Sequence, residues 1–250
     1  MIKGLYTAAS SMVATSRKLN IISNNLANSN TPAYKKDRGI QKSFSEMYLS
    51  RLEKGKEAVG IGEAGSSVAL ADTYTDMSSG KLKFTNNPLN LAIKGEGYFV
   101  IDTPMGRRYS RDGNFKLNED GEIVNSQGYV LIGNNGVMQT ISGEKIHFDS
   151  EGQLSLGEIS ADSIMIVDFE NDNMLQKEGD NLFKLVDGGK ELEADNYELM
   201  QGYLEESNVN IVNEMVNMIE VNRLYEANQR VIRSADETLD KAVNEIGRLR

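Results

Sequence analysis

The C-terminal stretch of the sequence, residues 207–249, has the longest helical pattern in the chain and most constrains the fold. It contains no proline, and Gly247 near its end is its one glycine. Mostly apolar residues recur at every seventh position in two rows, which are Ile211, Met218, Tyr225, Ile232, Leu239 and Ile246, and Val221, Asn228, Ala235, Ala242 and Leu249. Two such rows, three positions apart, form the heptad face of one α-helix. At 1.5 Å per residue this helix would be roughly 60 Å long, so it needs a partner along its length.

The N-terminus carries a second heptad pattern. Its two rows are Leu5, Met12, Leu19 and Leu26, and Ala8, Thr15 and Ile22. Pro32 ends this helix, because the residue before a proline avoids the helical region. The two helices could form an intramolecular hairpin that covers one side of a globular domain. We favour a surface where several helices meet, because both heptad faces are narrow stripes and the amides of Asn20, Asn24 and Asn28 need partners when they are covered.

Charge and composition exclude several classes of protein. The chain has 250 residues, with 37 acidic and 27 basic side chains and a net charge of −10. Because binding to phosphates requires a basic stripe, we expect no nucleic-acid partner. The chain has no cysteine, which excludes disulfide bonds and thiolate chemistry. No apolar run reaches the roughly eighteen residues of a membrane span, so we expect no membrane insertion.

Glycine separates the two ends of the chain from its middle. Of the 23 glycines, only Gly4 and Gly247 fall outside residues 39–202. The ends therefore predict helices, and the middle predicts turns and strands.

The predicted fold class is α+β. An antiparallel β domain is carried between N- and C-terminal heptad helices, and the helices pair as a coiled-coil-like domain. Three parts are expected. A discontinuous helical assembly domain comprises residues 1–30 and 207–250, and the β domain comprises residues 81–206. Between them, residues 31–80 form an extended linker with a possible short helix at residues 43–56.

Turn pairs and short apolar runs alternate through the β domain. Alternation with a period of two runs through residues 91–93 and 98–101. The turn pairs then follow at short intervals, and they are Asp112-Gly113, Asp120-Gly121, Gln127-Gly128, Asn135-Gly136, Glu151-Gly152 and Asp187-Gly188. The clearest predicted hairpin has Asp120-Gly121 at its turn, between the apolar runs 115–117 and 122–124.

The residues that could carry chemistry lack the context that chemistry needs. Residues 60–65 match the G-x-G-x-x-G pattern, but a charged stretch precedes them instead of a strand, so we expect a flexible linker and no nucleotide. His147 is the one histidine, and its place between Ile146 and Phe148 predicts a side chain that faces solvent. A lone histidine forms neither a His-based triad nor a ligand cluster. The carboxylates mostly fall in turns or on outer helix faces. We therefore predict no enzymatic activity, no cofactor and no metal.

Both chain ends and the middle resemble one protein family. The N-terminal signature of bacterial flagellar rod and hook proteins resembles residues 5–9 with Met12, and residues 22–28 with Thr31. The family's C-terminal signature is resembled by residues 207–209, 214–216, 218–220 and 223–228. Residues 91–99 and 109–113 resemble the β-domain motifs of FlgG/FlgF-type rod proteins. Ser11 stands where many members have glycine, and residues 45–75 fit the pattern poorly. Because that stretch separates rod subtypes, proximal and distal rod remain two alternatives.

The resemblance implies a structural subunit of the flagellar basal-body rod, which crosses the cell envelope. It also implies export by the flagellar type III apparatus and helical polymerisation with copies of itself and related rod and hook proteins. A peptidoglycan hydrolase that uses β-domain carboxylates, and a soluble β module that does not assemble, are the alternatives. The residues expected at the assembly interface are Leu5, Ala8, Met12, Leu19, Ile22, Asn24, Asn25, Leu26, Asn28, Ile211, Met215, Met218, Ile219, Tyr225, Asn228, Ile232, Leu239 and Ile246.

Overall fold

The computed structural model describes residues 2–43, 47–51, 59–64, 68–140, 146–157, 159–186 and 188–246. The chain forms two compact units. The helical unit comprises Met1–Ala27, Asp37–Tyr74 and Asn210–Arg250, and the β unit comprises Asn28–Lys36 and Thr75–Val209. The chain therefore passes between the units four times, after residues 27, 36, 74 and 209. This division differs from the expected three parts, because residues 28–36 belong to the β unit and residues 37–74 belong with the helices.

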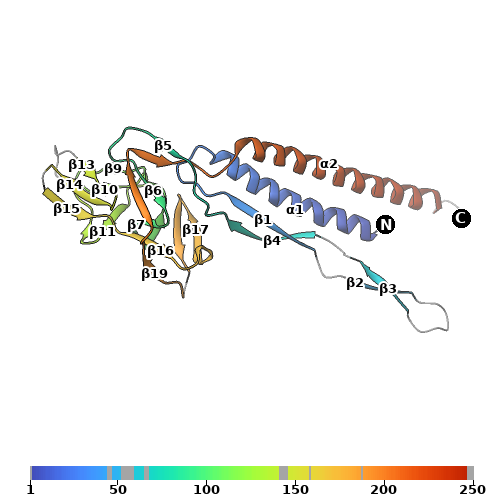
Figure 1. The fold of residues 1–250 in the computed structure, drawn as a ribbon. Coiled ribbons are helices and arrows are strands. Elements are labelled where there is room, and N and C mark those ends of the chain that lie inside the picture. The colour runs from blue at the N-terminus through green and yellow to red at the C-terminus, as the bar shows by residue number, and fades with distance from the viewer. Residues whose placement is uncertain are drawn as a thin grey trace. The chain divides into compact units, whose positions relative to one another are not determined.

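The helical unit is built on one helix from each end of the chain. Helix α1 spans Ile2–Ala27, and helix α2 spans Ile211–Lys241 and continues as a π-helical turn over Ala242–Ile246. The two helices pack along each other and run antiparallel, with the first turn of α1 and the last turn of α2 at the same end (Figure 1). The side chain of Asn210 caps α2 by accepting a hydrogen bond from the Asn213 N–H at 3.0 Å.

Two pairs of strands complete the helical unit. Strand β1 (Asp37–Ser43) contacts α1 and pairs with β4 (Val68–Thr75), and β2 (Met47–Arg51) pairs antiparallel with β3 (Val59–Ala64). The predicted short helix at residues 43–56 is wrong where the structure describes this stretch, since Met47–Arg51 is a strand. A single short helix is marginal in water, whereas pairing with β3 satisfies the backbone groups of β2. The predicted flexible linker at residues 60–65 is also wrong for residues 60–64, because they lie in β3, which pairs with β2. Gly65 lies outside the described residues.

The β unit contains antiparallel strands throughout its described residues. Its main sheet has the order β17-β18-β8-β7-β11-β10-β9, with β12 on β11, β16 on β7, and β19 on β16. Smaller sheets are β13-β14-β15, β20-β6 and β21-β5. The bounds are β5 Leu82–Phe84, β6 Leu91–Gly95, β7 Tyr98–Thr103, β8 Gly106–Ser110, β9 Lys116–Leu117, β10 Ile123–Val124, β11 Val130–Gly133, β12 Gly136–Val137, β13 Ile146–Phe148, β14 Gln153–Leu156, β15 Ile159–Ser163, β16 Ile166–Phe169, η1 Asp172–Met174, β17 Leu175–Gly179, β18 Leu182–Leu185, β19 Glu191–Glu193, β20 Tyr197–Gln201 and β21 Tyr203–Glu205. The predicted α+β class with antiparallel sheets is confirmed.

Strand β7 lies between two hydrophobic cores. Phe99 and Ile101 point into one core, and Tyr98 and Val100 point into the other, because successive side chains of a strand face opposite sides. In the first core the rings of Phe99 and Phe115 meet edge to face at 5.3 Å. These four of the six β7 side chains are buried, so this strand contributes to both cores.

Three turns of the β unit share one five-residue motif. Each begins with Asn or Asp, and its Oδ1 atom accepts hydrogen bonds from the backbone N–H groups two and four residues later. Each has a glycine at its fourth position with a φ between 79° and 90°, a region that favours glycine. The motifs start at Asn118, Asn125 and Asp149. The predicted hairpin at Asp120-Gly121 is one of them, and it joins β9 to β10.

Replacing the first residue of this motif should destabilise the β unit. Asn125 is buried and accepts from Gln127 N–H at 3.0 Å and Tyr129 N–H at 2.9 Å. We expect Asn125→Ala to lower the free energy of unfolding by about 1–3 kcal/mol in denaturant titrations, because two backbone donors lose their acceptor. The exposed neighbour Gln127 provides the control, and Gln127→Ala should change stability by less than about 0.5 kcal/mol. Equal effects of the two substitutions would contradict this role of Asn125.

Candidate functional site

Each of the two helices has buried residues in one of its heptad rows. Ala8, Thr15 and Ile22, the companion row of α1, are buried, and Val221 is the buried residue among the described positions of α2. The polar position in the α2 row also has a partner in the same chain, since Asn228 Nδ2 donates to Ser11 Oγ at 2.9 Å. One position of the α2 row therefore contacts α1 within the same chain.

Asn25 connects α1 to the neighbouring strand. Its side chain is buried, its Nδ2 donates to the Asp37 carbonyl at 2.9 Å, and its Oδ1 accepts from the Asp37 N–H at 3.0 Å. The amide thus satisfies both backbone groups of the first β1 residue, as a neighbouring strand would. This residue, expected at the assembly interface, has its polar groups engaged inside the helical unit.

The remaining expected interface residues divide by exposure. Those that are half-buried are Leu5, Met12, Leu19, Leu26, Met218, Tyr225 and Ile232. Those that are exposed are Asn24, Ile211, Met215, Ile219 and Leu239. Asn28 is half-buried and belongs to the β unit, and the side chain of Ile246 lies outside the described part of the structure.

A second apolar face of α2 is exposed, and we call it the exposed α2 face. Val212, Met215, Val216 and Ile219 follow the spacing i, i+3, i+4, i+7, which gathers them on one side of a helix. Their side chains are 49–68% exposed. Since a helix turns by roughly 100° per residue, Val212 and Ile219 lie nearly opposite the buried Val221. Other exposed apolar residues of the two helices are Leu224, Val231 and Val243 on α2, and Tyr6 and Val13 on α1.

The β unit contains the place where the chain ends leave it, and we call this place the arm junction. It comprises residues 28–36 (the N-terminal arm), 75–81 and 205–209 (the C-terminal arm). The side chain of Asn208 joins the three segments, because its Oδ1 accepts from Lys36 N–H at 2.8 Å and its Nδ2 donates to the carbonyls of Asp76 and Ser78 at 2.7 and 3.0 Å.

Side chains from β17 and the turn after it also hold the N-terminal arm. Lys177 Nζ donates to the Lys35 carbonyl at 2.9 Å and lies 3.9 Å from the centre of the Tyr34 ring, a cation–π contact. Asn181 Nδ2 donates to the Pro32 carbonyl at 2.9 Å. The stretch that follows α1 is thus bound along its length to the β unit.

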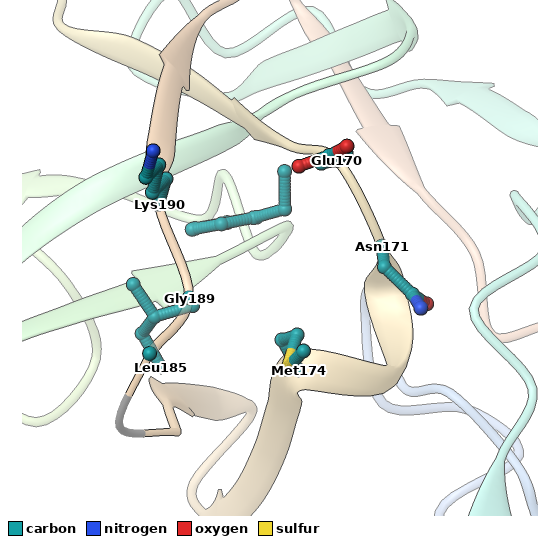
Figure 2. A pocket seen from close by; sticks show the side chains of 8 residues that line it. Glu170, Asn171, Met174, Leu185, Gly189 and Lys190 are labelled. Carbon is teal, nitrogen blue, oxygen red and sulfur yellow. The ribbon is translucent and has the colours of Figure 1, made fainter.

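A cavity of about 420 Å³ opens on the β unit beside η1 (Figure 2). Glu170 and Lys190 lie on opposite sides of one end, and Met174 and Leu185 lie toward the other. Glu170 is the one carboxylate in the described lining, and it is exposed. A glycosidase requires two carboxyl groups that flank the scissile bond, so this cavity does not supply the pair that the hydrolase alternative needs.

Other sequence features concern the same question of chemistry. His147 is exposed as predicted, and its Nδ1 lies 3.0 Å from Gln201 Oε1. Within the described residues, no group of three or more His, Asp or Glu side chains is placed to hold a metal ion. Among the helices of those residues, none is both long and apolar enough to cross a membrane.

Comparison with known proteins identifies the family. The model of the flagella basal body rod protein family matches residues 5–35, that of the flagellar hook protein FlgE/F/G D1 domain matches residues 92–160, and that of the flagellar basal body rod FlgEFG protein C-terminal region matches residues 200–245. The flagellar hook-basal body complex protein FlhO of Bacillus subtilis is 32% identical, and the alignment covers 100% of both chains. The flagellar basal-body rod protein FlgG of Borreliella burgdorferi is 34% identical over 98% of both chains, and FlgF of Rhizobium meliloti is 31% identical over 99% of both.

The chain belongs to the FlgE/F/G family of flagellar rod and hook proteins. This is a family of structural proteins, and it places the chain in the flagellar basal body. The N-terminal match runs from α1 into the arm junction, and the C-terminal match runs from β20 through that junction into α2. The family resemblance found in the sequence is confirmed.

Sequence reasoning missed two features of this rod-family chain. Half of the exposed α2 face, Val212 and Val216, was not expected at the interface, although the helical spacing of the four residues could have identified it. The contacts of Asn208 join segments far apart in the sequence, so no local sequence pattern predicts them.

Shortening a buried residue of the α1 heptad rows should destabilise the helical unit. Ile22 is 4% exposed and Val13, on the same helix, is 56% exposed. We expect Ile22→Ala to lower the free energy of unfolding by about 2–4 kcal/mol, because it leaves a cavity between packed elements. The control Val13→Ala should change it by less than about 0.5 kcal/mol. The loss of helical circular dichroism in denaturant measures the free energy of unfolding of both variants. An Ile22→Ala variant as stable as the parent would show that the surroundings of Ile22 are not packed in solution.

The pKa of Asp112 predicts a pH dependence near the arm junction. Burial raises the pKa of this carboxyl above its ordinary value of 3.8, against hydrogen bonds from Asn114 and Asn181 that lower it. A raised pKa means that the folded state binds the proton more tightly, so this contribution to stability is present below pH 3.8 and is lost as the pH rises through the raised pKa. We expect Asp112→Asn to be more stable than the parent at neutral pH, and the difference to disappear below pH 3.8. Denaturant unfolding across this pH range measures the difference, and one that is constant with pH would contradict the assignment.

Proposed function

We propose that the chain is a structural, non-catalytic subunit of the flagellar rod that polymerises helically through its terminal helices. In this proposal α1 and α2 form a coiled-coil-like pair, and the exposed α2 face binds other subunits. The observation that carries the proposal is that α2 has a group of exposed apolar residues nearly opposite its buried Val221. Monomeric soluble proteins rarely leave a contiguous apolar patch of this kind in water.

The size of the apolar face supports assembly into a polymer. Covering Val212, Met215, Val216 and Ile219, each about half exposed, would contribute roughly 1 kcal/mol per side chain. That sum alone does not exceed the cost of ordering a free subunit. In a helical array each subunit meets several neighbours, and a contact between two different faces repeats without closing. Many modest contacts would then add up to a stable shaft that transmits torque.

Rod and hook relatives are the proposed neighbours, and we propose that the chain reaches them through the flagellar type III export apparatus. The absence of cysteine suits this route, because a chain without thiols can pass to an oxidising space without forming disulfides. Among the described residues, both hydrophobic core clusters lie in the β unit, so the chain ends should be easier to unfold for passage.

A charge on the exposed α2 face should block assembly without unfolding the subunit. We expect Val216→Asp/Ile219→Asp to keep the helical circular dichroism and unfolding midpoint of the monomer. Its incorporation into isolated basal bodies should fall at least tenfold, because the two carboxylates would be desolvated without partners. Motility of a strain that carries the variant as its one copy should be lost with it.

Two controls separate charge from position. Asn222→Asp adds a carboxylate at an exposed polar position of the same helix and should leave incorporation unchanged. Met218→Asp, which faces the α1 side, should instead destabilise the monomer by several kcal/mol. Normal incorporation of the Val216→Asp/Ile219→Asp variant would refute the proposed interface.

A further inference from the structure

The arm junction contains a buried ion pair whose halves come from opposite ends of the chain. Lys35, on the N-terminal arm, and Glu205, at the start of the C-terminal arm, approach to 2.7 Å between Nζ and Oε1. Both side chains are 1% exposed. The two residues are 170 positions apart in the sequence, so the pair forms only when both arms lie on the β unit.

Each member of the pair also binds backbone of the third segment. Lys35 Nζ donates to the Ser78 carbonyl at 3.0 Å, and Glu205 Oε1 accepts from the Gly80 N–H at 2.7 Å. A side chain at Gly80 would not fit, because its Cβ would lie 1.8 Å from the Glu206 carbonyl oxygen. The three segments are therefore packed backbone against backbone around the pair.

Lys35 is the main compensating charge for Glu205. The Oε2 atom of Glu205 is buried and accepts no hydrogen bond from the described residues. The guanidinium of Arg111 comes no closer to Oε2 than 4.0 Å, and its N–H groups donate to the carbonyls of Ile93 and Gly95. Burial lowers the pKa of Lys35, and the charge of Glu205 opposes that shift. Among the described residues, neither member of the pair has a second oppositely charged group at hydrogen-bond distance, since their other hydrogen bonds are to the backbone of Ser78 and Gly80.

We propose that this ion pair is a latch that makes the docking of the two arms onto the β unit a single cooperative event. If the N-terminal arm leaves, Glu205 loses the counter-ion that it hydrogen-bonds and keeps Arg111 at 4.0 Å, so the C-terminal arm is held less firmly as well. Lys35 likewise loses its hydrogen-bonded counter-ion when the C-terminal arm leaves. Removing one partner of a buried pair is far more costly than replacing both by apolar groups. The latch is independent of the proposed polymer, because it lies within the β unit of one chain.

Two backbone amides report on the arms separately. The Glu206 N–H donates to the Lys81 carbonyl at 2.7 Å, and neither residue belongs to the N-terminal arm. The Asp76 N–H donates to the Lys36 carbonyl at 2.9 Å, and neither residue belongs to the C-terminal arm. Hydrogen exchange at these two amides, measured in the full chain, therefore shows which arm has been released.

The latch predicts that a change on one arm loosens the other. We expect Lys35→Met to speed exchange at Glu206 by about 100-fold or more, and Glu205→Gln to do the same at Asp76. The double variant Lys35→Met/Glu205→Leu should bring both amides back to within about tenfold of the parent, because neither member of the pair is left as a buried charge without the other. If Lys35→Met speeds exchange at Asp76 and leaves Glu206 unchanged, the arms dock independently and the latch is refuted.

A matched control and a measurement without variants complete the test. The pair Lys94–Glu198 has the same 2.7 Å separation but is 61% and 51% exposed, so Lys94→Met should leave exchange at both amides within about threefold of the parent.

Should the single variants fail to fold, hydrogen exchange in the unmodified chain still tests the latch. Under low denaturant, the latch requires the Glu206 and Asp76 amides to share one opening free energy and one denaturant slope. Two distinct slopes would overturn it.

Discussion

The antiparallel packing of α1 along α2 is the constraint on which the rest of the helical unit depends. A heptad face covers only part of a helix surface, so the partner helix cannot shield the other sides. On α2 this leaves Val212, Val216 and Ile219 in water, nearly opposite the side that Val221 occupies. The chain ends are therefore structurally complete toward each other and incomplete toward their surroundings. The proposed assembly would cover these exposed apolar side chains.

The β unit, in contrast, is stabilised by its own packing. Strand β7 is buried on both faces, so one strand belongs to two cores and links them. Turns that start at Asn118, Asn125 and Asp149 close hairpins with side-chain hydrogen bonds, which makes the loops part of the ordered structure. This arrangement gives the rod-family chain a β unit that is stabilised by its own packing.

The arm junction gives the family signatures a role within the single chain. Residues 207–209, which resemble the C-terminal signature of rod and hook proteins, include Asn208, whose amide joins Lys36 to the segment that contains Asp76. Lys35 lies at the end of the region matched by the N-terminal family model. Both signatures therefore meet on the β unit. Matches to terminal signatures in this family thus indicate intramolecular contacts as well as helices.

Local patterns in the sequence determined the elements whose formation depends on neighbouring residues. Heptad spacing identified both helices, alternation identified β7, and Asp120-Gly121 identified a hairpin, because helix faces, strand faces and tight turns are set within a few residues. The sequence did not show that residues 47–51 form a strand, since their partner at residues 59–64 has an equally weak pattern and only pairing makes either a strand. Nor did it show that Asn25 would bind Asp37 or that Lys35 would meet Glu205. Those contacts join segments whose separation along the chain carries no signal, and a buried polar group finds its partner only when the tertiary structure brings the two together.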